Sequence, residues 1–291
     1  QAGEVASRDA CNIIGYCFSS LAGELAGDAA LAIPAAFPAQ GDLLVKAIRL
    51  ANRNIYIHSR SHSNFSGMGT TVVGAVLEKN IINIAHVGDS RVYRLTEAGL
   101  VPLTTDHSWV SELMQTGQFS DIEAAQMVGR NVITRALGVN ERVEIDYRAD
   151  RIKAGEIYIF CTDGLSAYAE DEEIFEAAKG CKSDVNLIVD NLIQLANDRG
   201  GQDNVTIIAI RIDSFEESPE LPIIKPVTIS IEGDDALLRE NQILDTLTKA
   251  WEKTQDIVTE EEGKGKKAPL ILIFFLFIVA AVILIYFATH R

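Results

Sequence analysis

Cysteine is scarce in this chain of 291 residues, and its spacing excludes two common roles. Cys11, Cys17, Cys161 and Cys181 form no CxxC pair and do not have the spacing of zinc ligands. We expect them to be buried structural thiols in a reducing compartment. Cys161 lies close to Asp163, but no arginine-rich phosphate loop surrounds it, so we do not expect it to act as a nucleophile.

Basic side chains are also in the minority. The chain carries 26 Lys and Arg against 41 Asp and Glu, for a net charge of −15. A surface that binds nucleic acid needs a basic face, so this balance argues against nucleic acid as a partner. The deficit is largest in residues 213–262, with 14 acidic and 4 basic side chains, which favours an acidic linker there.

Charge is missing altogether from residues 268–288, which read APLILIFFLFIVAAVILIYFA. A helix of this length is about 31 Å long, enough to cross the hydrocarbon core of a bilayer. We therefore expect one transmembrane helix and a location in the cell membrane. Lys264, Lys266 and Lys267 precede the stretch, whereas Arg291 follows it, which favours a cytoplasmic position for the N-terminal side.

Apolar periodicity predicts helices, then strands, then helices and a last strand before residue 213. The expected helices are 1–25, 41–59, 171–179 and 184–198, and the expected strands are 70–77, 81–87, 91–95, 145–152, 157–161 and 205–212. This segregation predicts an α+β fold, a four-layer α-β-β-α sandwich of two mainly antiparallel sheets, rather than a parallel βαβ sheet.

Three regions follow from these patterns. We expect a domain at 1–212, a linker at 213–267 and the membrane helix at 268–288. Three prolines between residues 219 and 226 favour the linker. Residues 236–258 are a candidate helix within it, because apolar residues recur every seven positions at Leu237, Leu244, Trp251 and Val258. Self-association through this stripe remains open.

Four short motifs contain an aspartate. They are Gly88-Asp89-Ser90-Arg91, Thr105-Asp106-His107-Ser108, Thr162-Asp163-Gly164 and Gly201-Gln202-Asp203-Asn204. Three of these aspartates end an apolar run, where a strand would deliver a carboxylate to the rim of a sheet. Carboxylates gathered in this way bind hard divalent cations, and paired cations are used to hydrolyse phosphate esters.

Six motifs in a fixed order indicate a family. They are Ser66-Gly67-Met68-Gly69-Thr70-Thr71, Val87-Gly88-Asp89-Ser90-Arg91, Thr105-Asp106-His107-Ser108, Arg130 to Gly138, Thr162-Asp163-Gly164-Leu165 and Gly201-Gln202-Asp203-Asn204. Together they resemble the metal-dependent serine/threonine protein phosphatases of type 2C, the PPM family, in their bacterial form. The resemblance covers residues 1 to about 212.

The resemblance assigns metal ligands. Asp163 and Asp203 are similar to the two aspartates that hold the family's two catalytic Mn²⁺ or Mg²⁺ ions. Asp89 is similar to the residue that binds, together with Asp163, a third and weaker metal. The ions activate water for attack on phosphorus, so no enzyme nucleophile is required.

Neighbouring residues have expected supporting roles. Asn204 is placed to orient a metal-bound aspartate through a hydrogen bond. Gly164 and Gly201 permit turns that a side chain would obstruct, and Arg91 is expected to form a structural ion pair. Residues 108–137 resemble the flap beside the family's active site, which influences the choice of substrate.

Other polar residues in and near the motifs are expected to be structural. His86 lies on an apolar strand and is interpreted as a core or edge histidine. Asp106 and His107 are expected to fix a turn rather than transfer protons. His58 and His62 lie in a Ser/Asn-rich loop and are expected to be exposed. No general acid is assigned.

One family feature is expected upstream of this sequence. The family places its metal-bridging aspartate in Asp-Gly-x-x-Gly, just before a helix that begins much as Ala2 to Ser7 does. Gly27-Asp28 is no substitute, because glycines do not follow it. We expect the bridging aspartate, a phosphate-binding arginine and one or two strands directly before Gln1, and little activity without them.

The resemblance implies a membrane-tethered phosphatase of phosphoserine and phosphothreonine in cytoplasmic proteins. A membrane serine/threonine kinase and its targets are the implied partners. Two alternatives stay open: a catalytically dead phosphatase-fold module that binds phosphoproteins, and a phosphatase of small phosphate esters.

Overall fold

The computed structural model describes residues 2–33, 37–115, 117, 132–181, 184–230 and 233–263, with side chains up to residue 249. No helix in these ranges combines the length and apolar character needed to cross a membrane. The predicted membrane helix at 268–288 lies outside the described residues.

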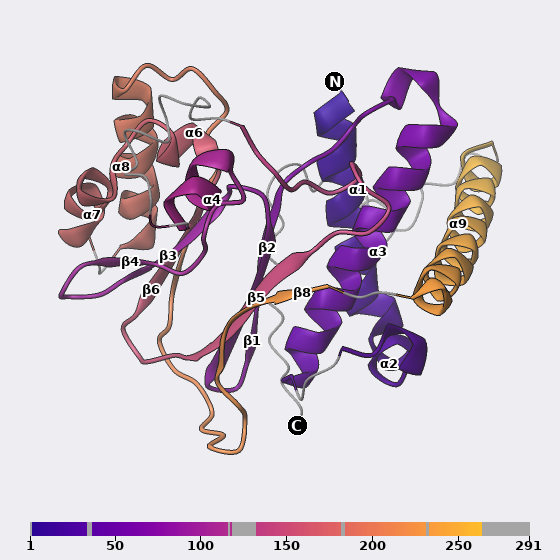
Figure 1. Ribbon diagram of the computed structural model, residues 1–291, viewed down its shortest axis with the longest axis horizontal. Helices are drawn as coiled ribbons and strands as arrows, with labels where there is room; N and C mark the ends of the chain where they lie inside the picture. Colours follow the sequence, from indigo (N-terminus) through magenta and orange to yellow (C-terminus); the bar gives the residue numbers. More distant parts are fainter. Residues whose placement is uncertain are drawn as a thin grey trace.

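Two antiparallel sheets occupy the middle of the molecule (Figure 1). The first has the order β1 (Val72–Glu78), β2 (Ile81–Val87), β5 (Ile145–Arg151), β8 (Ile224–Ile229). The second has the order β4 (Leu100–Pro102), β3 (Arg91–Leu95), β6 (Ile157–Cys161), β7 (Ile207–Arg211). The prediction of an α+β fold with two mainly antiparallel sheets is confirmed.

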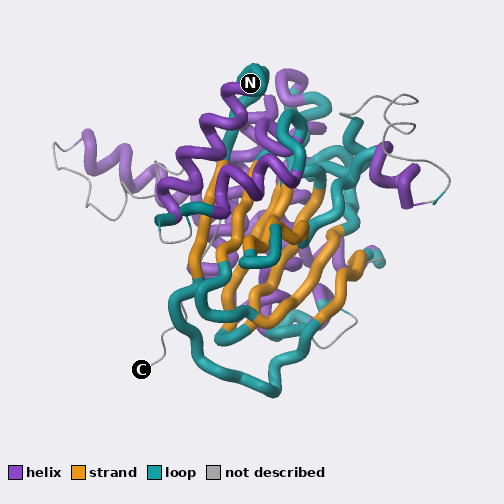
Figure 2. The backbone as a smooth tube through the Cα atoms, turned by 90° about the vertical axis from the view of Figure 1, so that its left-hand side faces the viewer, coloured by secondary structure: helices purple, strands orange, loops and turns teal. Residues whose placement is uncertain are grey.

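Helices surround the strands (Figure 2). Before the sheets come α1 (Ala2–Tyr16), the π-helix η1 (Cys17–Leu21), α2 (Ala22–Ala26), the 3₁₀ turn η2 (Ala29–Leu31), α3 (Ala39–Ser61) and the 3₁₀ turn η3 (Ser63–Phe65). Later come α4 (Trp109–Gln115), α6 (Asp163–Ser166), α7 (Asp171–Lys179), α8 (Val185–Asp198) and α9 (Asp234–Gly263). The predicted helices at 1–25, 41–59, 171–179 and 184–198 are therefore present, within a few residues at their ends.

Side-chain alternation in the strands explains how the two sheets bury both faces. In β2, Ala85 and Val87 belong to the cluster shared with the N-terminal helices, whereas Ile82 and Ile84 belong to a cluster shared with the second sheet. Successive side chains of a strand point to opposite faces, so a strand covered on both sides reads as a nearly continuous apolar run. Every residue of β2 is buried.

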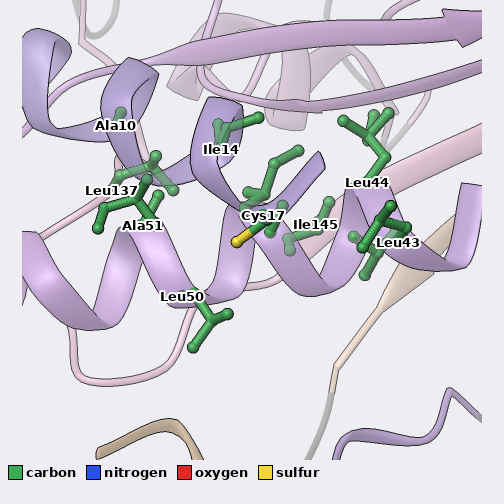
Figure 3. Close-up of a cluster of buried hydrophobic side chains, with 14 of the residues drawn as sticks. Ala10, Ile14, Cys17, Leu43, Leu44, Leu50, Ala51, Leu137 and Ile145 are labelled. Carbon is green, nitrogen blue, oxygen red and sulfur yellow. The ribbon is translucent and has the colours of Figure 1, made fainter. Parts of the chain in front are cut away.

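Three apolar clusters hold the elements together. The largest joins α1, α3 and α9 to the first sheet, and Figure 3 shows Ile14, Cys17, Leu44 and Ile145 within it. The second joins α7 and α8 to the second sheet, and the third lies between the two sheets. Fully burying one leucine of this kind contributes roughly 1.5–3 kcal/mol, so these clusters dominate the stability of the fold.

The candidate helix at 236–258 is confirmed as α9 (Asp234–Gly263), but a linker at 213–267 is wrong where the chain joins the fold. Residues 224–229 form β8, which pairs with β5, and α9 packs on α3 through buried Ile243, Leu244 and Leu247. The strand was not predicted because Lys225 and Pro226 are typical of a linker. Both residues suit the edge strand β8, since proline there need not donate a hydrogen bond and lysine discourages pairing with a further strand.

The heptad stripe is only partly available for self-association. Leu244 is 5 % exposed and packs inside the chain's own core, so a coiled coil through this position would have to displace it. The buried positions of α9 follow a helical period along its first half, as expected for a helix that faces its own domain. The side chains of Trp251 and Val258 lie outside the described part.

Candidate active site

Strand pairing brings Asp89 and Asp163 to one edge of the second sheet. Asp89 lies in the connection between β2 and β3, and Asp163 is the first residue of α6, directly after β6. Arg91 at the start of β3 is the partner of Cys161 at the end of β6, so both connections leave the sheet at the same edge.

Asp203 reaches this edge from the connection between α8 and β7. The Thr162 main-chain N–H donates to the carbonyl of Thr206 (3.1 Å), and the Thr206 N–H donates to the Thr162 hydroxyl (3.1 Å). These two hydrogen bonds join the segment that carries Asp163 to the segment that carries Asp203. The two sequence motifs are therefore one structural unit.

Gly164 makes the close approach of these segments possible. A Cβ atom at this position would lie 2.4 Å from the carbonyl oxygen of Asn204, a backbone atom that cannot move aside. Gly201 has a φ of +53°, in the left-handed region that favours glycine. The expected turn roles of both glycines therefore agree with the structure.

The carboxylates of Asp89, Asp163 and Asp203 have the electrostatics of a cation site, although their oxygens do not all lie within 4.8 Å of one another. Burial, followed by repulsion from Asp163 and Asp106, raises the pKa of Asp89 to about 6. Burial and then the charge of Asp203 raise the pKa of Asp163. Within the described residues, no Lys, Arg or His lies within 4.0 Å of the carboxylates of Asp89, Asp163 or Asp203. Excess negative charge of this kind fits the oxygen ligands that Mn²⁺ and Mg²⁺ take.

The ion pair expected at Arg91 forms with Asp106. The Arg91 guanidinium donates Nε to Oδ1 (2.8 Å) and Nη2 to Oδ2 (2.7 Å), a bidentate pair, and Nη1 donates to the Tyr93 hydroxyl (2.9 Å). Tyr93 in turn donates to Asp171 at the start of α7 (2.8 Å). Planar two-point pairing gives geometric specificity. Asp106 is thereby fixed to β3, in agreement with its expected structural role.

A second polar cluster contains His86, His107 and Asp146. Within the described part of the chain, this is the only group of three or more His, Cys, Asp or Glu residues with ligand atoms within 4.8 Å of one another. The His107 ring uses both nitrogens, however, since Nδ1 accepts from the Gly88 N–H (3.1 Å) and Nε2 lies 3.2 Å from Asp146. Arg135 also donates to Asp146 (3.0 Å). The Arg135 guanidinium is already paired with the Asp146 carboxylate, so we interpret the cluster as a hydrogen-bond network rather than a metal site.

Hydrogen bonds connect the remaining motifs to the site. The hydroxyls of Thr71 and Ser90 lie 3.1 Å apart, which joins the first motif to the second. The Thr134 N–H donates to the His107 carbonyl (2.8 Å), which ties residues 132–138 to the third. The flap expected at 108–137 is described only at residues 108–115, 117 and 132–137.

The remaining supporting residues can also be placed. The Asn204 main-chain N–H donates to Asp203 Oδ1 (2.7 Å), so the contact made here is from the backbone, and the side-chain role of Asn204 stays a prediction. Burial raises the pKa of Cys161 to about 12, so its thiol is protonated near neutral pH and is no nucleophile. His86 is buried, as expected, and burial lowers its pKa. His58 is partly exposed and contacts Asp9 (3.1 Å).

Sequence reasoning missed Asp146, Arg135 and Thr228. Thr228 in β8 donates to Asp146 (2.7 Å), and Asp146 lies on the face of β5 opposite Ile145 and Tyr147. The charged residues that alternate with apolar ones in β5 were the available signal, because the face that they form must meet polar partners or water.

The amino-acid sequence is similar to those of bacterial serine/threonine phosphatases. The chain is 37 % identical over 170 residues to the serine/threonine phosphatase stp of Listeria monocytogenes, covering 58 % of this chain and 67 % of that protein. It is 34 % identical over 198 residues to the serine/threonine protein phosphatase PstP of Mycobacterium tuberculosis, covering 67 % of this chain and 37 % of that protein. No family model matches the chain.

Solved structures extend the likeness to the fold. The crystal structure of M. tuberculosis PstP/Ppp has a TM-score of 0.61 at 31 % identity, covering 73 % of this chain and 83 % of that one. The PstP catalytic domain in complex with two manganese ions has a TM-score of 0.57 at 32 % identity, with the same coverage. The chain belongs to the type 2C (PPM) family of metal-dependent serine/threonine protein phosphatases, in its bacterial form.

Proposed function

We propose that this chain hydrolyses phosphoserine and phosphothreonine in proteins, with Mn²⁺ or Mg²⁺ held at the cluster of Asp163, Asp203 and Asp89. The observation that carries the proposal is a set of carboxylates brought to one edge of the second sheet, none of which has a Lys, Arg or His within 4.0 Å among the described residues, and two of which have raised pKa values. The related PstP domain in complex with two manganese ions supports the choice of metal.

Each residue has a distinct task in this proposal. Asp163 and Asp203 hold the two catalytic ions, and Asp163 shares a third, weaker one with Asp89. Bound there, the cations lower the pKa of coordinated water and offset charge on the phosphoryl oxygens. Gly164 allows the segments that contain Asp163 and Asp203 to pack closely against each other. The protonated thiol of Cys161 takes no part in the reaction. The three apolar clusters support the four-layer α-β-β-α arrangement that positions these residues.

The metal requirement gives a direct test. We expect the protein, expressed from its natural start codon, to release phosphate from a phosphothreonine peptide only when Mn²⁺ or Mg²⁺ is present. EDTA should abolish the release, and excess Mn²⁺ should restore it, because the carboxylates alone cannot activate water. Phosphate release and peptide binding are measured side by side.

The other outcomes separate the alternatives. Release that survives EDTA would overturn the metal assignment. Peptide binding without release, in a protein that contains the family's upstream segment, would identify a binding module. Release from a small aryl phosphate but not from phosphopeptides would identify a phosphatase of small esters.

We propose that the uncharged stretch 268–288 anchors the chain in the cell membrane, with the phosphatase domain in the cytoplasm. The stretch is long enough to span a bilayer, and the lysines before it favour this orientation. Phosphorylated proteins, among them the targets of a membrane kinase, are the proposed partners. Alkaline carbonate should leave the protein in the membrane pellet, whereas release into the supernatant would contradict the anchor.

A further inference from the structure

The backbone immediately before Asp89 is held by His107, a residue from a different connection. The Gly88 N–H donates to His107 Nδ1 (3.1 Å), and the His107 N–H donates to the Gly88 carbonyl (3.0 Å). Gly88 has a φ of +109°, and a Cβ there would lie 2.3 Å from the Thr71 side chain. Two hydrogen bonds and close packing therefore determine the direction in which the chain delivers Asp89.

The hydrogen bonds at the two nitrogens of the His107 ring indicate which tautomer is present. Because Nδ1 accepts a hydrogen bond from an N–H, it carries no proton, and the proton of the neutral ring lies on Nε2. Nε2 then donates to Asp146 Oδ2 (3.2 Å). Arg135 and Thr228 donate to the other oxygen, Oδ1, at 3.0 and 2.7 Å. Burial would raise the pKa of Asp146, but hydrogen bonds from His107 and Thr228 outweigh it and hold the value at about 2.

The ring is also held in place by its surroundings. His86 stacks on His107 with 4.7 Å between ring centroids and 21° between planes, and His86 Nε2 lies 2.9 Å from the Thr105 carbonyl oxygen. His107 is 5 % exposed. An imidazole packed on one face and hydrogen-bonded at both nitrogens has little freedom to rotate.

We propose that His107 is a positioning residue for Asp89, with Asp146 selecting the tautomer that accepts the Gly88 N–H. His107 acts through the backbone and does not bind the metal. The proposal rests on the function proposed above, since it takes Asp89 as a metal ligand. Groups that orient metal ligands typically change metal affinity by about 10–100-fold when they are removed.

Two substitutions separate the two nitrogens of the ring. In His107→Asn, the side-chain oxygen takes the place of Nδ1 and keeps the acceptor for Gly88, but the contact with Asp146 is lost. In His107→Gln, the amide reaches the place of Nε2 and keeps the contact with Asp146, but the acceptor for Gly88 is lost. A role in positioning Asp89 predicts more damage in the Gln variant, whereas a purely structural role through Asp146 predicts more in the Asn variant.

Two measurements on the protein expressed from its natural start codon test this. Hydrogen exchange of the segment containing Gly88, followed in metal-free protein, is expected to accelerate at least about 10-fold in His107→Gln and to stay near wild type in His107→Asn, because only the Gln variant frees the amide. Titration with Mn²⁺, followed by the electron paramagnetic resonance of the free ion, is expected to show the weakest site about 10-fold or more weaker in His107→Gln alone.

The outcomes are decisive in both directions. The positioning role would be overturned if His107→Gln kept the wild-type exchange rate and the wild-type Mn²⁺ affinity. It would also be overturned if His107→Asn showed changes in exchange and affinity as large as those of His107→Gln, or larger. Asp89→Ala serves as the reference for loss of the weak site. If Asp89→Ala binds as many Mn²⁺ ions as wild type, the metal assignment fails, and the exchange measurement shows separately whether His107 holds Gly88.

Discussion

Asp163→Ala is expected to lower kcat/KM for a phosphothreonine peptide by at least about 10³-fold, because metal ions supply several kcal/mol of transition-state stabilisation. In the proposed site Asp163 contributes to both the catalytic pair and the third ion, whereas Asp89 contributes only to the third. The loss should therefore exceed that of Asp89→Ala. Steady-state kinetics at saturating Mn²⁺ give the comparison, and Mn²⁺ titration shows the number of ions lost.

Asp190→Ala is the matched control for this loss. Asp190 is an exposed carboxylate on α8, so the substitution removes the same charge without touching the cluster. Surface substitutions of this kind usually change stability by no more than about 0.5 kcal/mol, and kcat/KM should stay at the wild-type value. An Asp163→Ala protein within about 10-fold of wild type would contradict the assignment of Asp163 as a shared ligand.

Glu240→Ala is expected to lower the free energy of unfolding by about 3–5 kcal/mol, because removal of one partner leaves a buried charge uncompensated. Glu240 on α9 is 3 % exposed and lies 2.6 Å from Arg49 on α3, which is 9 % exposed. Arg49 Nη1 already has no hydrogen-bond partner, so nothing in its surroundings replaces the lost carboxylate. Urea denaturation with an unchanged m-value measures the effect.

Arg142→Ala provides the comparison, because the partner of Arg142 lies on the same helix α9. Arg142 pairs with Asp234 at 3.0 Å, but the side chains are 43 % and 101 % exposed, so water competes with the pair. Its loss should cost less than about 1 kcal/mol. If Glu240→Ala costs no more than Arg142→Ala, the contact between α9 and α3 does not depend on the buried pair.

The fold was predictable where burial leaves a clear pattern. Residues 81–87 read as a strand because apolar side chains cover both of its faces, and the structure places β2 there. Residues 224–229 were not found because an edge strand needs apolar residues on one face at most, and Lys225 and Pro226 resemble linker composition. The partner strand β5, far away in the sequence, decides this element rather than its own residues.

The placement of the candidate ligands could be predicted in part. Asp89, Asp163 and Asp203 each lie within a recognisable motif, and the structure brings the segments that contain them to one edge of a sheet, whereas their binding of metal stays a prediction. The network around His107 depends on Asp146 and Thr228, residues whose proximity arises only from the pairing of β5 with β8. No local sequence pattern contains that pairing, because the contacts join a residue of the connection between β4 and α4 to residues of two strands that are far apart in the sequence.

The ion pairs of α9 also determine when during synthesis the N-terminal helices can complete their packing. Arg239 binds Asp28 across 211 residues of sequence, and Glu240 neutralises Arg49. At roughly 5–20 residues per second, the ribosome needs about 10–40 s to make the chain between Asp28 and Arg239. During that interval the N-terminal helices have neither their covering helix nor its counter-charges. The protein is thus expected to complete its first core only after α9 has been synthesised.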